Sequence, residues 1–286
     1  MEEKLLETAI SAARAGADVL RSYFRRDGLQ VSRKGQNDFV TEADKASEAA
    51  VLAEIHRRFP DHRILAEEGG AADLNRESEH EWLVDPLDGT TNFLQGLPVW
   101  CVSVACRHAG RLVAGVVLDP EGDNLFAALR GRGATWNGRP MSASEHPGLD
   151  GAFLATGYPF RALPTLDLYL EIFRDVFRRS KAIRRCGSAA LDLAYTAAGV
   201  YDGFFEFRLS PWDIGAGILL IEEAGGVVTD LDGGTDYFRS GNIVAGGRAV
   251  QRELWEAAAR HAREADIDRL NPIGAPAPAA SAAGPA

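Results

Sequence analysis

Residue types suited to phosphoryl chemistry stand close together between Asp85 and Phe93. Asp85 and Asp88 are three positions apart with a proline between them, and Gly89 and Thr90 follow directly. Paired carboxylates are ligands for hard divalent cations such as Mg²⁺, and backbone N–H groups after a glycine can hold a phosphate. The same dipeptides are also common in solvated turns, so the interpretation depends on acids elsewhere in the chain.

Acidic residues recur at four further places. Asp44 has a structural explanation, because Thr41 and Asp44 fit a helix capping box. Asp213 opens a helical pattern, where the helix dipole favours an acid, while Glu67 and Glu206 follow short apolar strands. Ligands of α/β folds bind where strands end and helices begin, and the positions of Glu67, Asp85 and Asp213 therefore favour one shared site.

The apolar spacing predicts the elements that position these acids. The short strand 82–84 leads into Asp85, and three strands after residue 99 suggest an antiparallel meander with helices packed on it. After about residue 150 helices and strands alternate, which is typical of an α/β arrangement. The predicted helices are 3–26, 42–59, 166–177, 188–198, 213–224 and 250–263, and the other predicted strands are 31–34, 64–66, 100–107, 112–118, 125–129, 153–156, 183–185, 203–207 and 242–245.

The change of pattern divides the chain into two predicted parts and a tail. Residues 1–148 form an N-terminal α+β part that carries most of the acids, and residues 149–265 form an α/β part that carries Asp213. The Ala- and Pro-rich segment 271–286 lacks the apolar bulk to pack and is expected to be disordered.

Composition narrows the class of protein. The net charge of −10 argues against a general nucleic-acid binder. The three cysteines form no CxxC pair, which fits a reducing compartment. No stretch has the length of a membrane span, and the first residues lack the pattern of a signal peptide. We therefore expect a cytoplasmic protein.

Four motifs in order resemble those of the inositol monophosphatase family, a group of metal-dependent, lithium-sensitive sugar phosphatases. The first signature is similar to the segment from Asp85 to Phe93, and the second to the segment from Trp212 to Gly226. The segment from Asp38 to Asp44 and the pair Glu67-Glu68 match two upstream motifs. The segments from Arg185 to Tyr195 and from Tyr201 to Glu206 are especially similar to bacterial members. The resemblance implies the family's layered α/β sandwich, with an antiparallel sheet in the first half and an α/β second half.

The resemblance also implies two to three Mg²⁺ ions per site. The first would be held by Glu67, Asp85 and the backbone carbonyl of Leu87, and the second by Asp85, Asp88 and Asp213. Cations would relieve the repulsion among crowded carboxylates. No Cys or His lies in the acidic motifs, which speaks against a zinc site or a covalent intermediate.

The implied reaction is hydrolysis of a phosphate monoester by a metal-activated water. Thr90 would hydrogen-bond the water and Asp44 would accept from Thr90, while the N–H groups of Gly89 and Thr90 would hold the phosphate. Asp88, Glu206 and the run Gly187, Ser188 and Ala189 match positions that contact the sugar or inositol. Lys34 matches a basic residue near the phosphate, although a solvated lysine in a polar loop explains it equally well.

The resemblance leaves several functions open. Inositol-1-phosphate is the leading substrate, and fructose-1,6-bisphosphate is the second candidate. Relatives also hydrolyse histidinol phosphate, NADP or 3′-phosphoadenosine 5′-phosphate. A different class is a binding protein that partners with the transcription machinery and has a secondary phosphatase site, although the acidic charge argues against direct RNA contact. Relatives are commonly homodimers.

Overall fold

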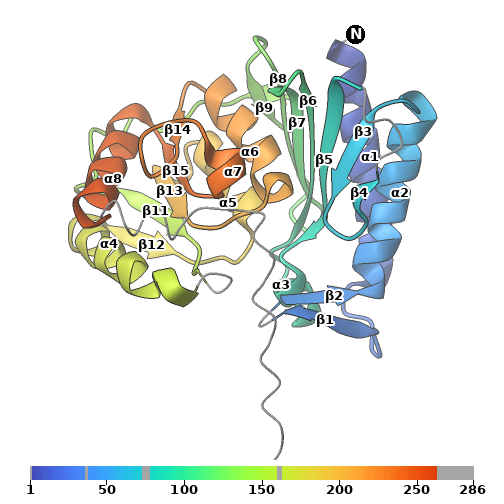
Figure 1. Ribbon diagram of the computed structural model, residues 1–286, viewed down its shortest axis with the longest axis horizontal. Helices are drawn as coiled ribbons and strands as arrows, with labels where there is room; N and C mark the ends of the chain where they lie inside the picture. The colour runs from blue at the N-terminus through green and yellow to red at the C-terminus, as the bar shows by residue number, and fades with distance from the viewer. Residues whose placement is uncertain (1, 36–37, 73–77, 160–162, 263–286) are drawn as a thin grey trace, which may run out of the picture.

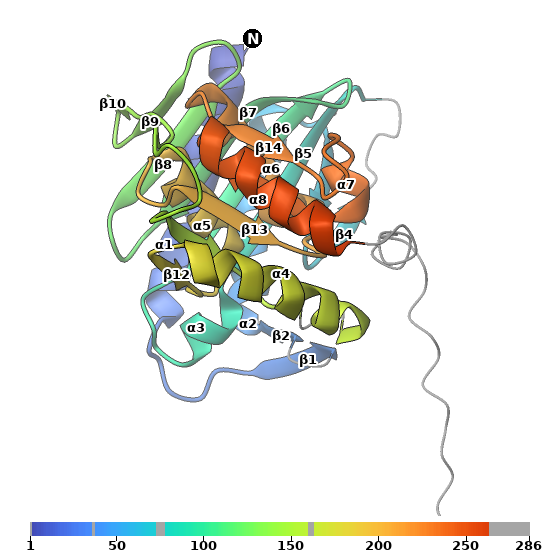
Figure 2. The same cartoon turned by 90° about the vertical axis from the view of Figure 1, so that its left-hand side faces the viewer.

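Two β-sheets, each covered by helices on both faces, stack into five layers (Figure 1). This computed structural model describes residues 2–35, 38–72, 78–159 and 163–262. One pair of helices covers the outer face of the larger sheet and a second pair lies between the sheets. A third pair covers the outer face of the smaller sheet and faces the viewer in Figure 2. In that order the pairs are α1 (Glu2–Tyr23) and α2 (Glu42–Arg58), α5 (Ala189–Ala197) and α6 (Pro211–Glu223), and α4 (Leu166–Arg179) and α8 (Arg248–His261).

The larger sheet has eight strands in the order β10-β9-β8-β7-β6-β5-β3-β4. Neighbouring strands are antiparallel except β3 and β5, which run parallel. Its strands are β3 (Arg63–Ala66), β4 (Gly70–Ala72), β5 (His80–Asp88), β6 (Cys101–His108), β7 (Arg111–Asp119), β8 (Asn124–Leu129), β9 (Ala134–Trp136) and β10 (Arg139–Pro140).

The smaller sheet has five strands in the order β12-β11-β13-β15-β14, with a parallel half and an antiparallel half. Its strands are β11 (Phe153–Thr156), β12 (Ala182–Arg184), β13 (Gly203–Glu206), β14 (Val227–Thr229) and β15 (Ile243–Gly246). The remaining elements are the hairpin of β1 (Val31–Gly35) and β2 (Asp38–Thr41), the short helices α3 (Thr90–Leu94) and α7 (Tyr237–Ser240), and a 3-10 turn at Leu163–Thr165.

Three apolar clusters fill the spaces between the layers. Trp82 and Trp100 are fully buried between the larger sheet and the pair α1 and α2. The cluster around α5 and α6 joins the two sheets, so both halves of the chain share one core. Burying a large apolar side chain contributes roughly 1.5–3 kcal/mol, and this shared core fixes the position of one half against the other.

Glycines allow α6 to lie close to its neighbours. A side chain at Gly215 would come within 2.7 Å of Leu83 on β5, and one at Gly217 within 2.5 Å of Leu193 on α5. Because only hydrogen occupies these positions, the helix packs tightly between β5 and α5. The first turn of α6, which carries Asp213, is thereby held near the end of β5.

The layered α/β class expected from the sequence is confirmed, while several local predictions are corrected. The strand predicted as 82–84 continues through Asp85 to Asp88, because both acids pair with β6 across an irregularity in the register. Residues 70–72, where no strand was predicted, form strand β4. The tail 271–286 and residues 73–77 lie outside the described residues. No helix in the described part of the chain is long and apolar enough to cross a membrane.

A stack of histidine rings on the larger sheet predicts that acid weakens the fold. The ring of His62 lies 4.4 Å from that of His80 and accepts a hydrogen bond from Trp82 Nε1 at 3.1 Å. Burial, followed by the charge of His80, lowers the pKa of His62 from 6.5 to about 4. The unfolded chain therefore binds a proton more readily, and the free energy of unfolding should fall as the pH drops below 6.5 towards 4.

We expect this histidine to account for about 1 kcal/mol of that loss once partial exposure is allowed for. Urea unfolding of the wild type and His62→Gln at pH 7 and pH 5 measures this contribution. Glutamine stays neutral at both pH values and can still accept the hydrogen bond from Trp82 Nε1. The variant should lose less stability between the two pH values. His146→Gln is the matched control, because His146 lies outside the stack. It should lose as much stability between pH 7 and pH 5 as the wild type does. Equal losses in the wild type and His62→Gln would contradict the assignment.

Candidate active site

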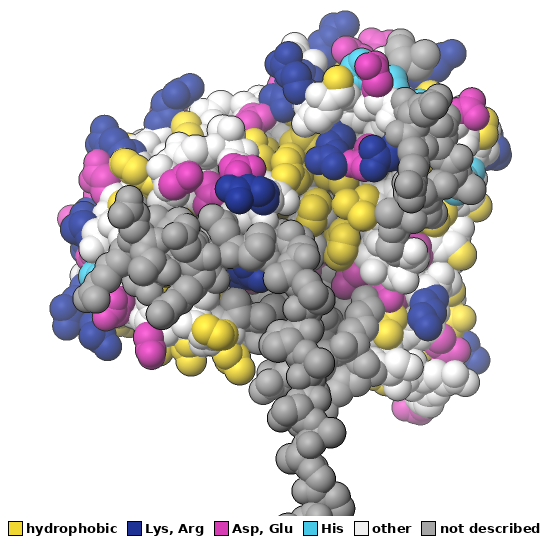
Figure 3. All heavy atoms as spheres, in the orientation of Figure 1, with side chains coloured by type: hydrophobic (Ala, Val, Ile, Leu, Met, Phe, Trp, Pro, Cys, Tyr) yellow, Lys and Arg dark blue, Asp and Glu magenta, His cyan; other side chains and the backbone are white. Residues whose placement is uncertain are grey.

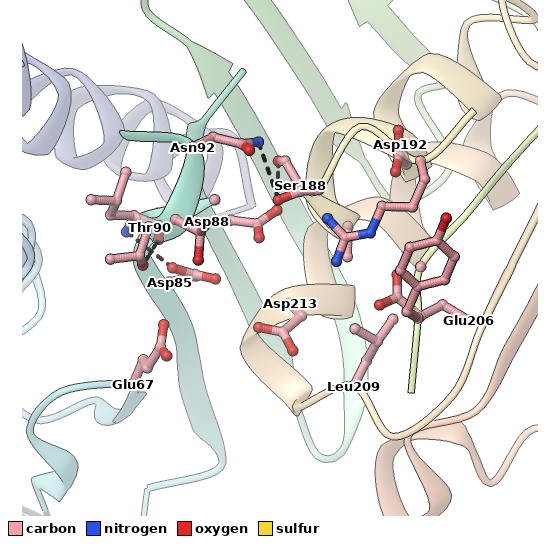
Figure 4. Close-up of a pocket in the computed structure, with 18 of the residues that line it drawn as sticks. Glu67, Asp85, Asp88, Thr90, Asn92, Ser188, Asp192, Glu206, Leu209 and Asp213 are labelled. Carbon is pink, nitrogen blue, oxygen red and sulfur yellow. Dashed lines mark hydrogen bonds between the residues drawn. The ribbon is translucent and has the colours of Figure 1, made fainter. Parts of the chain in front are cut away.

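A cavity of about 400 Å³ brings together residues from both halves of the chain (Figure 4). Six carboxylates and one guanidinium line it among the described residues, so its charge is strongly negative. The lining residues are Phe39, Glu67, Asp85, Leu87, Asp88, Gly89, Thr90, Thr91, Asn92, Thr156, Gly157, Tyr158, Arg185, Gly187, Ser188, Ala189, Asp192, Glu206, Leu209 and Asp213.

Asp85 lies on β5 at the centre of the acidic group. Its side chain is buried, with 1% of its surface exposed, and its Oδ1 accepts the N–H of Leu87 at 3.0 Å. Burial raises the pKa of Asp85 well above its ordinary value, and the charges of Glu67, Asp88 and Asp213 raise it further. The four acids therefore repel one another, and a bound cation would relieve that repulsion.

Asp88 ends β5 and is held by groups from the second half of the chain. Its Oδ2 accepts hydrogen bonds of 2.7 Å from the Ser188 hydroxyl and from the Ala190 N–H. Ser188 is also the N-cap of α5 and accepts from the Leu191 N–H. The start of α5 thus fixes the direction of the Asp88 carboxylate.

Asp213 and Glu67 lie near Asp85, on different elements (Figure 4). Asp213 lies in the first turn of α6, where its Oδ2 accepts the Ser210 N–H at 2.7 Å. Glu67 follows β3 directly, and its own N–H donates to the carbonyl of Val84 at 3.2 Å. The parallel pairing of β3 and β5 therefore places Glu67 at the same edge of the sheet as Asp85.

Thr90 and Asp44 form a hydrogen-bonded pair beside the acids. Thr90 Oγ1 lies 3.2 Å from Asp44 Oδ1 and 3.2 Å from the Leu87 carbonyl, and its single proton can be donated to one of them at a time. Asp44 is buried and also forms the capping box with Thr41. Burial raises the pKa of Asp44, while hydrogen bonds from Thr41 lower it. Both interpretations of Asp44, structural and functional, are thus compatible with the geometry.

Glycine is required at the turn between β5 and α3. Gly89 has a φ of 98°, and a side chain there would lie 2.9 Å from the carbonyl oxygen of Val99. This conformation brings the first N–H groups of α3 to the cavity, where they lack partners within the helix. The helix is then tied to the second half, because Asn92 Nδ2 donates to the carbonyl of Cys186 at 2.9 Å.

The structure brings most residues singled out from the sequence to this cavity. Glu206, the last residue of β13, lines the side opposite Glu67, and Ser188 lies between them (Figure 4). Gly187 and Ala189 also line the cavity. Asp44 reaches the site through Thr90 rather than as a lining residue. Lys34 lies on β1, and its side chain is outside the described part of the structure.

Several lining residues had no role assigned from the sequence, among them Asn92, Arg185 and Asp192. Asn92 lies within the first signature, and Arg185 and Asp192 lie within the run that resembles bacterial members. The sequence showed these residues in a motif, but their spacing did not indicate which of them face the cavity.

The acids have the ligand chemistry of a magnesium site. All the candidate ligands are oxygen atoms, which Mg²⁺ prefers. In the described residues no group of three or more His, Cys, Asp or Glu side chains is already arranged to hold a metal ion.

The sequence profile of the inositol monophosphatase family matches residues 1–266. Two proteins named Nus factor SuhB, from Pseudomonas aeruginosa and Escherichia coli K12, are each 47% identical to the chain. These matches cover 85% and 87% of this chain and 92% and 94% of theirs.

Two solved structures have a similar fold. One is the extragenic suppressor protein SuhB from Bartonella henselae, with a TM-score of 0.85 and 43% identity over 89% of this chain and 98% of that one. The other is an inositol monophosphatase from Anabaena sp. PCC 7120, with a TM-score of 0.82 and 39% identity over 92% and 98%.

Proposed function

Since the chain belongs to the inositol monophosphatase family, we propose that it hydrolyses inositol-1-phosphate to inositol and phosphate with the help of Mg²⁺. The observation that carries this proposal is the convergence of Glu67, Asp85, Asp88 and Asp213 on one cavity, where burial and then the charges of the other three acids raise the pKa of Asp85. Such a set of acids is poorly stable without cations and suited to binding them.

Two to three ions would be held by these residues. Glu67, Asp85 and the Leu87 carbonyl would bind one ion, and Asp85, Asp88 and Asp213 a second. When bound, such ions lower the pKa of a water and stabilise charge on the phosphate and the leaving oxygen. The Ser188 hydroxyl and Ala190 N–H, which hold Asp88, would fix that ligand and so the relative position of the ions.

The Thr90–Asp44 pair would orient and deprotonate the attacking water. Thr90 Oγ1 would accept a hydrogen bond from the water and donate its own proton to Asp44 Oδ1, with which it is already in contact. The N–H groups of Gly89 and Thr90 at the start of α3 would hold phosphate oxygens. This arrangement needs no covalent intermediate.

The second half of the chain would bind the polyol. Glu206 offers a carboxylate to hydroxyl groups, and Gly187, Ser188 and Ala189 form the wall beside Asp88. Because Glu206 would repel an additional phosphate, a monophosphate fits better than fructose-1,6-bisphosphate, which we keep as the alternative substrate. Lys34 near the phosphate stays a prediction from the sequence.

Phosphate release from a panel of substrates tests the proposal. The panel holds inositol-1-phosphate, fructose-1,6-bisphosphate, histidinol phosphate, NADP and 3′-phosphoadenosine 5′-phosphate, each with Mg²⁺. A clear preference for inositol-1-phosphate would support the assignment. Comparable rates on several substrates would support the hydrolysis of phosphate monoesters and reject the preference for inositol-1-phosphate. No phosphate release from any substrate would reject the proposed phosphatase activity.

Lithium should inhibit the enzyme, because Li⁺ can occupy a Mg²⁺ position among these oxygen ligands. We expect the rate at saturating substrate to fall in millimolar LiCl and to be unaffected by the same concentration of KCl. Full activity in lithium would contradict this prediction.

A role in transcription is a second candidate function, favoured by the 47% identity to proteins named Nus factor SuhB. On the face shown in Figure 3 basic and acidic side chains are interspersed, so any partner there would more naturally be a protein than RNA. Affinity capture with the wild type and the inactive Asp85→Asn tests this role. Recovery of RNA polymerase subunits by both would support it, and recovery by neither would reject it.

We propose that the protein acts in the cytoplasm, as its cysteines and its lack of a membrane pattern suggest, and that it forms a homodimer, as the resemblance implies. Sedimentation of the purified chain tests the homodimer, because a single species with twice the chain mass of 30.8 kDa is expected.

A further inference from the structure

Asp192 is a buried acid of the cavity that the proposed hydrolysis does not use. It lies in the first turn of α5, with only 2% of its surface exposed, and it lines the cavity wall. No hydrogen bond reaches its Oδ1 within the described residues. A buried polar group without a partner lowers stability, and such a cost is commonly kept where the group has a functional role.

Arg185 stands in the same wall and is the basic residue among the described lining residues. Its guanidinium carbon lies 5.1 Å from the ring centre of Tyr158. A side chain added to Gly187 would lie 2.5 Å from Arg185 Nη1, so the guanidinium bends back over the start of α5. The structure gives this guanidinium no hydrogen bond or ion pair to another described residue, and its donors are available to a ligand.

Asp192 and Glu206 lie on the side of the cavity away from Glu67 and Asp85 (Figure 4). A phosphate at the metal ligands would therefore direct the rest of its substrate towards Asp192. That part of the cavity offers carboxyl oxygens as acceptors and a guanidinium as donor. A hydroxyl group both donates and accepts, so this combination fits a ring carrying neighbouring hydroxyls.

We propose that Asp192 is a specificity-determining residue that accepts a hydrogen bond from a ring hydroxyl of the polyol, while Arg185 donates to the oxygen of the same or the adjacent hydroxyl. This inference rests on the proposed function and adds to it two residues that would select for the ring of the substrate. A second phosphate is disfavoured here, because Asp192 and Glu206 flank the guanidinium that would attract it.

The protonation state of Asp192 does not decide this role. Burial raises its pKa well above the ordinary value, the charge of Glu206 adds to this, and Arg185 acts in the opposite direction. An ionised carboxylate accepts on either oxygen, and a neutral carboxyl still accepts on one. The hydroxyl therefore finds an acceptor in both states.

Kinetics with two substrates test the proposal. Asp192→Leu keeps a similar volume and removes both oxygens, and Arg185→Met removes the guanidinium. Each should raise KM for inositol-1-phosphate by about 10-fold or more, the value of one hydrogen bond to a charged group. For glycerol 2-phosphate, which lacks a ring, KM should change less than about twofold, and kcat should change little for both substrates. Arg184→Met serves as the matched control and should resemble the wild type, because Arg184 does not line the cavity.

Thermal unfolding separates this role from a structural one. Because Asp192 Oδ1 lacks a partner, Asp192→Leu should unfold at the same or a higher temperature than the wild type in the absence of substrate. A lower unfolding temperature together with an equal loss on both substrates would show that Asp192 supports the fold, and would overturn the proposal.

The two proposals fail in different ways. If the wild type hydrolyses both substrates and the variants leave their KM ratio unchanged, the polyol subsite is wrong and the phosphatase stands. If the wild type hydrolyses neither substrate, the proposed function is rejected and the subsite with it.

Discussion

Asp85→Asn is expected to lower kcat/KM for inositol-1-phosphate by more than about 100-fold. Replacing a residue that only supports a metal ligand commonly lowers metal affinity or activity by about 10- to 100-fold. Asp85 would itself be a ligand shared by two ions, so its replacement should cost more. It is also the most enclosed of the four acids, with 1% of its surface exposed and three carboxylates raising its pKa. Asparagine keeps an oxygen for the Leu87 N–H but removes the negative charge.

The same variant should be no less stable than the wild type when Mg²⁺ is absent. Removing one charge from a group of mutually repelling acids relieves that repulsion, so a lost rate cannot be attributed to unfolding. Glu81→Gln is the matched control, since Glu81 lies on the same strand but pairs with Arg63 at 3.0 Å and with Arg107. It should lose stability and keep kcat/KM within about twofold below its unfolding temperature, since an ion pair of this kind contributes to folding rather than to the site. Unchanged kcat/KM in Asp85→Asn would contradict the role given to Asp85.

Thr90→Val is expected to lower kcat by about 100- to 10,000-fold, the range found when a group that transfers a proton is removed. Valine has nearly the shape of threonine, so the turn into α3 should be kept. What it lacks is the hydroxyl that lies 3.2 Å from Asp44 Oδ1. KM should change less than kcat, because the hydroxyl would act on the water and not on the bound substrate.

Thr90→Ser and Asp44→Asn complete this test. Serine keeps the hydroxyl and should retain most of the activity. Asp44→Asn removes the proton acceptor and should reduce kcat as Thr90→Val does, and the double variant should be little worse than either single one. If Asp44 serves only as the helix cap of α2, its replacement would lower the unfolding temperature and leave kcat unchanged, which would contradict the relay.

The parts of the fold that followed from the sequence are those with local signals. The long helices were recognisable from their apolar spacing, and the acidic motifs each lie at a strand end or a helix start. The extension of β5 through Asp88 had no local signal, because Pro86 and Gly89 are typical of a turn. Pairing with β6 overrides that preference, with a shift in the register between Asp85 and Asp88.

The sequence indicated which residues form the site, but not how they are arranged in space. Glu67, Asp85 and Asp213 come from β3, β5 and α6, and their convergence depends on sheet order and on the glycines that let α6 lie close to β5. The contacts of Asp88 with Ser188 and Ala190 join residues about a hundred positions apart. The buried position of Asp192 depends in the same way on how α5 packs between the sheets, which no local pattern reveals.

Phosphate release from inositol-1-phosphate by the purified chain, measured with and without Mg²⁺, tests the central claim most directly. The claim is that the carboxylates of the cavity hold Mg²⁺ and that a water then attacks the phosphate. After treatment with a chelator the rate should fall to background, and added Mg²⁺ should restore it in the wild type but not in Asp85→Asn. A chelator-treated enzyme that still releases phosphate at the full rate, or an Asp85→Asn variant that responds to Mg²⁺ as the wild type does, would contradict the account.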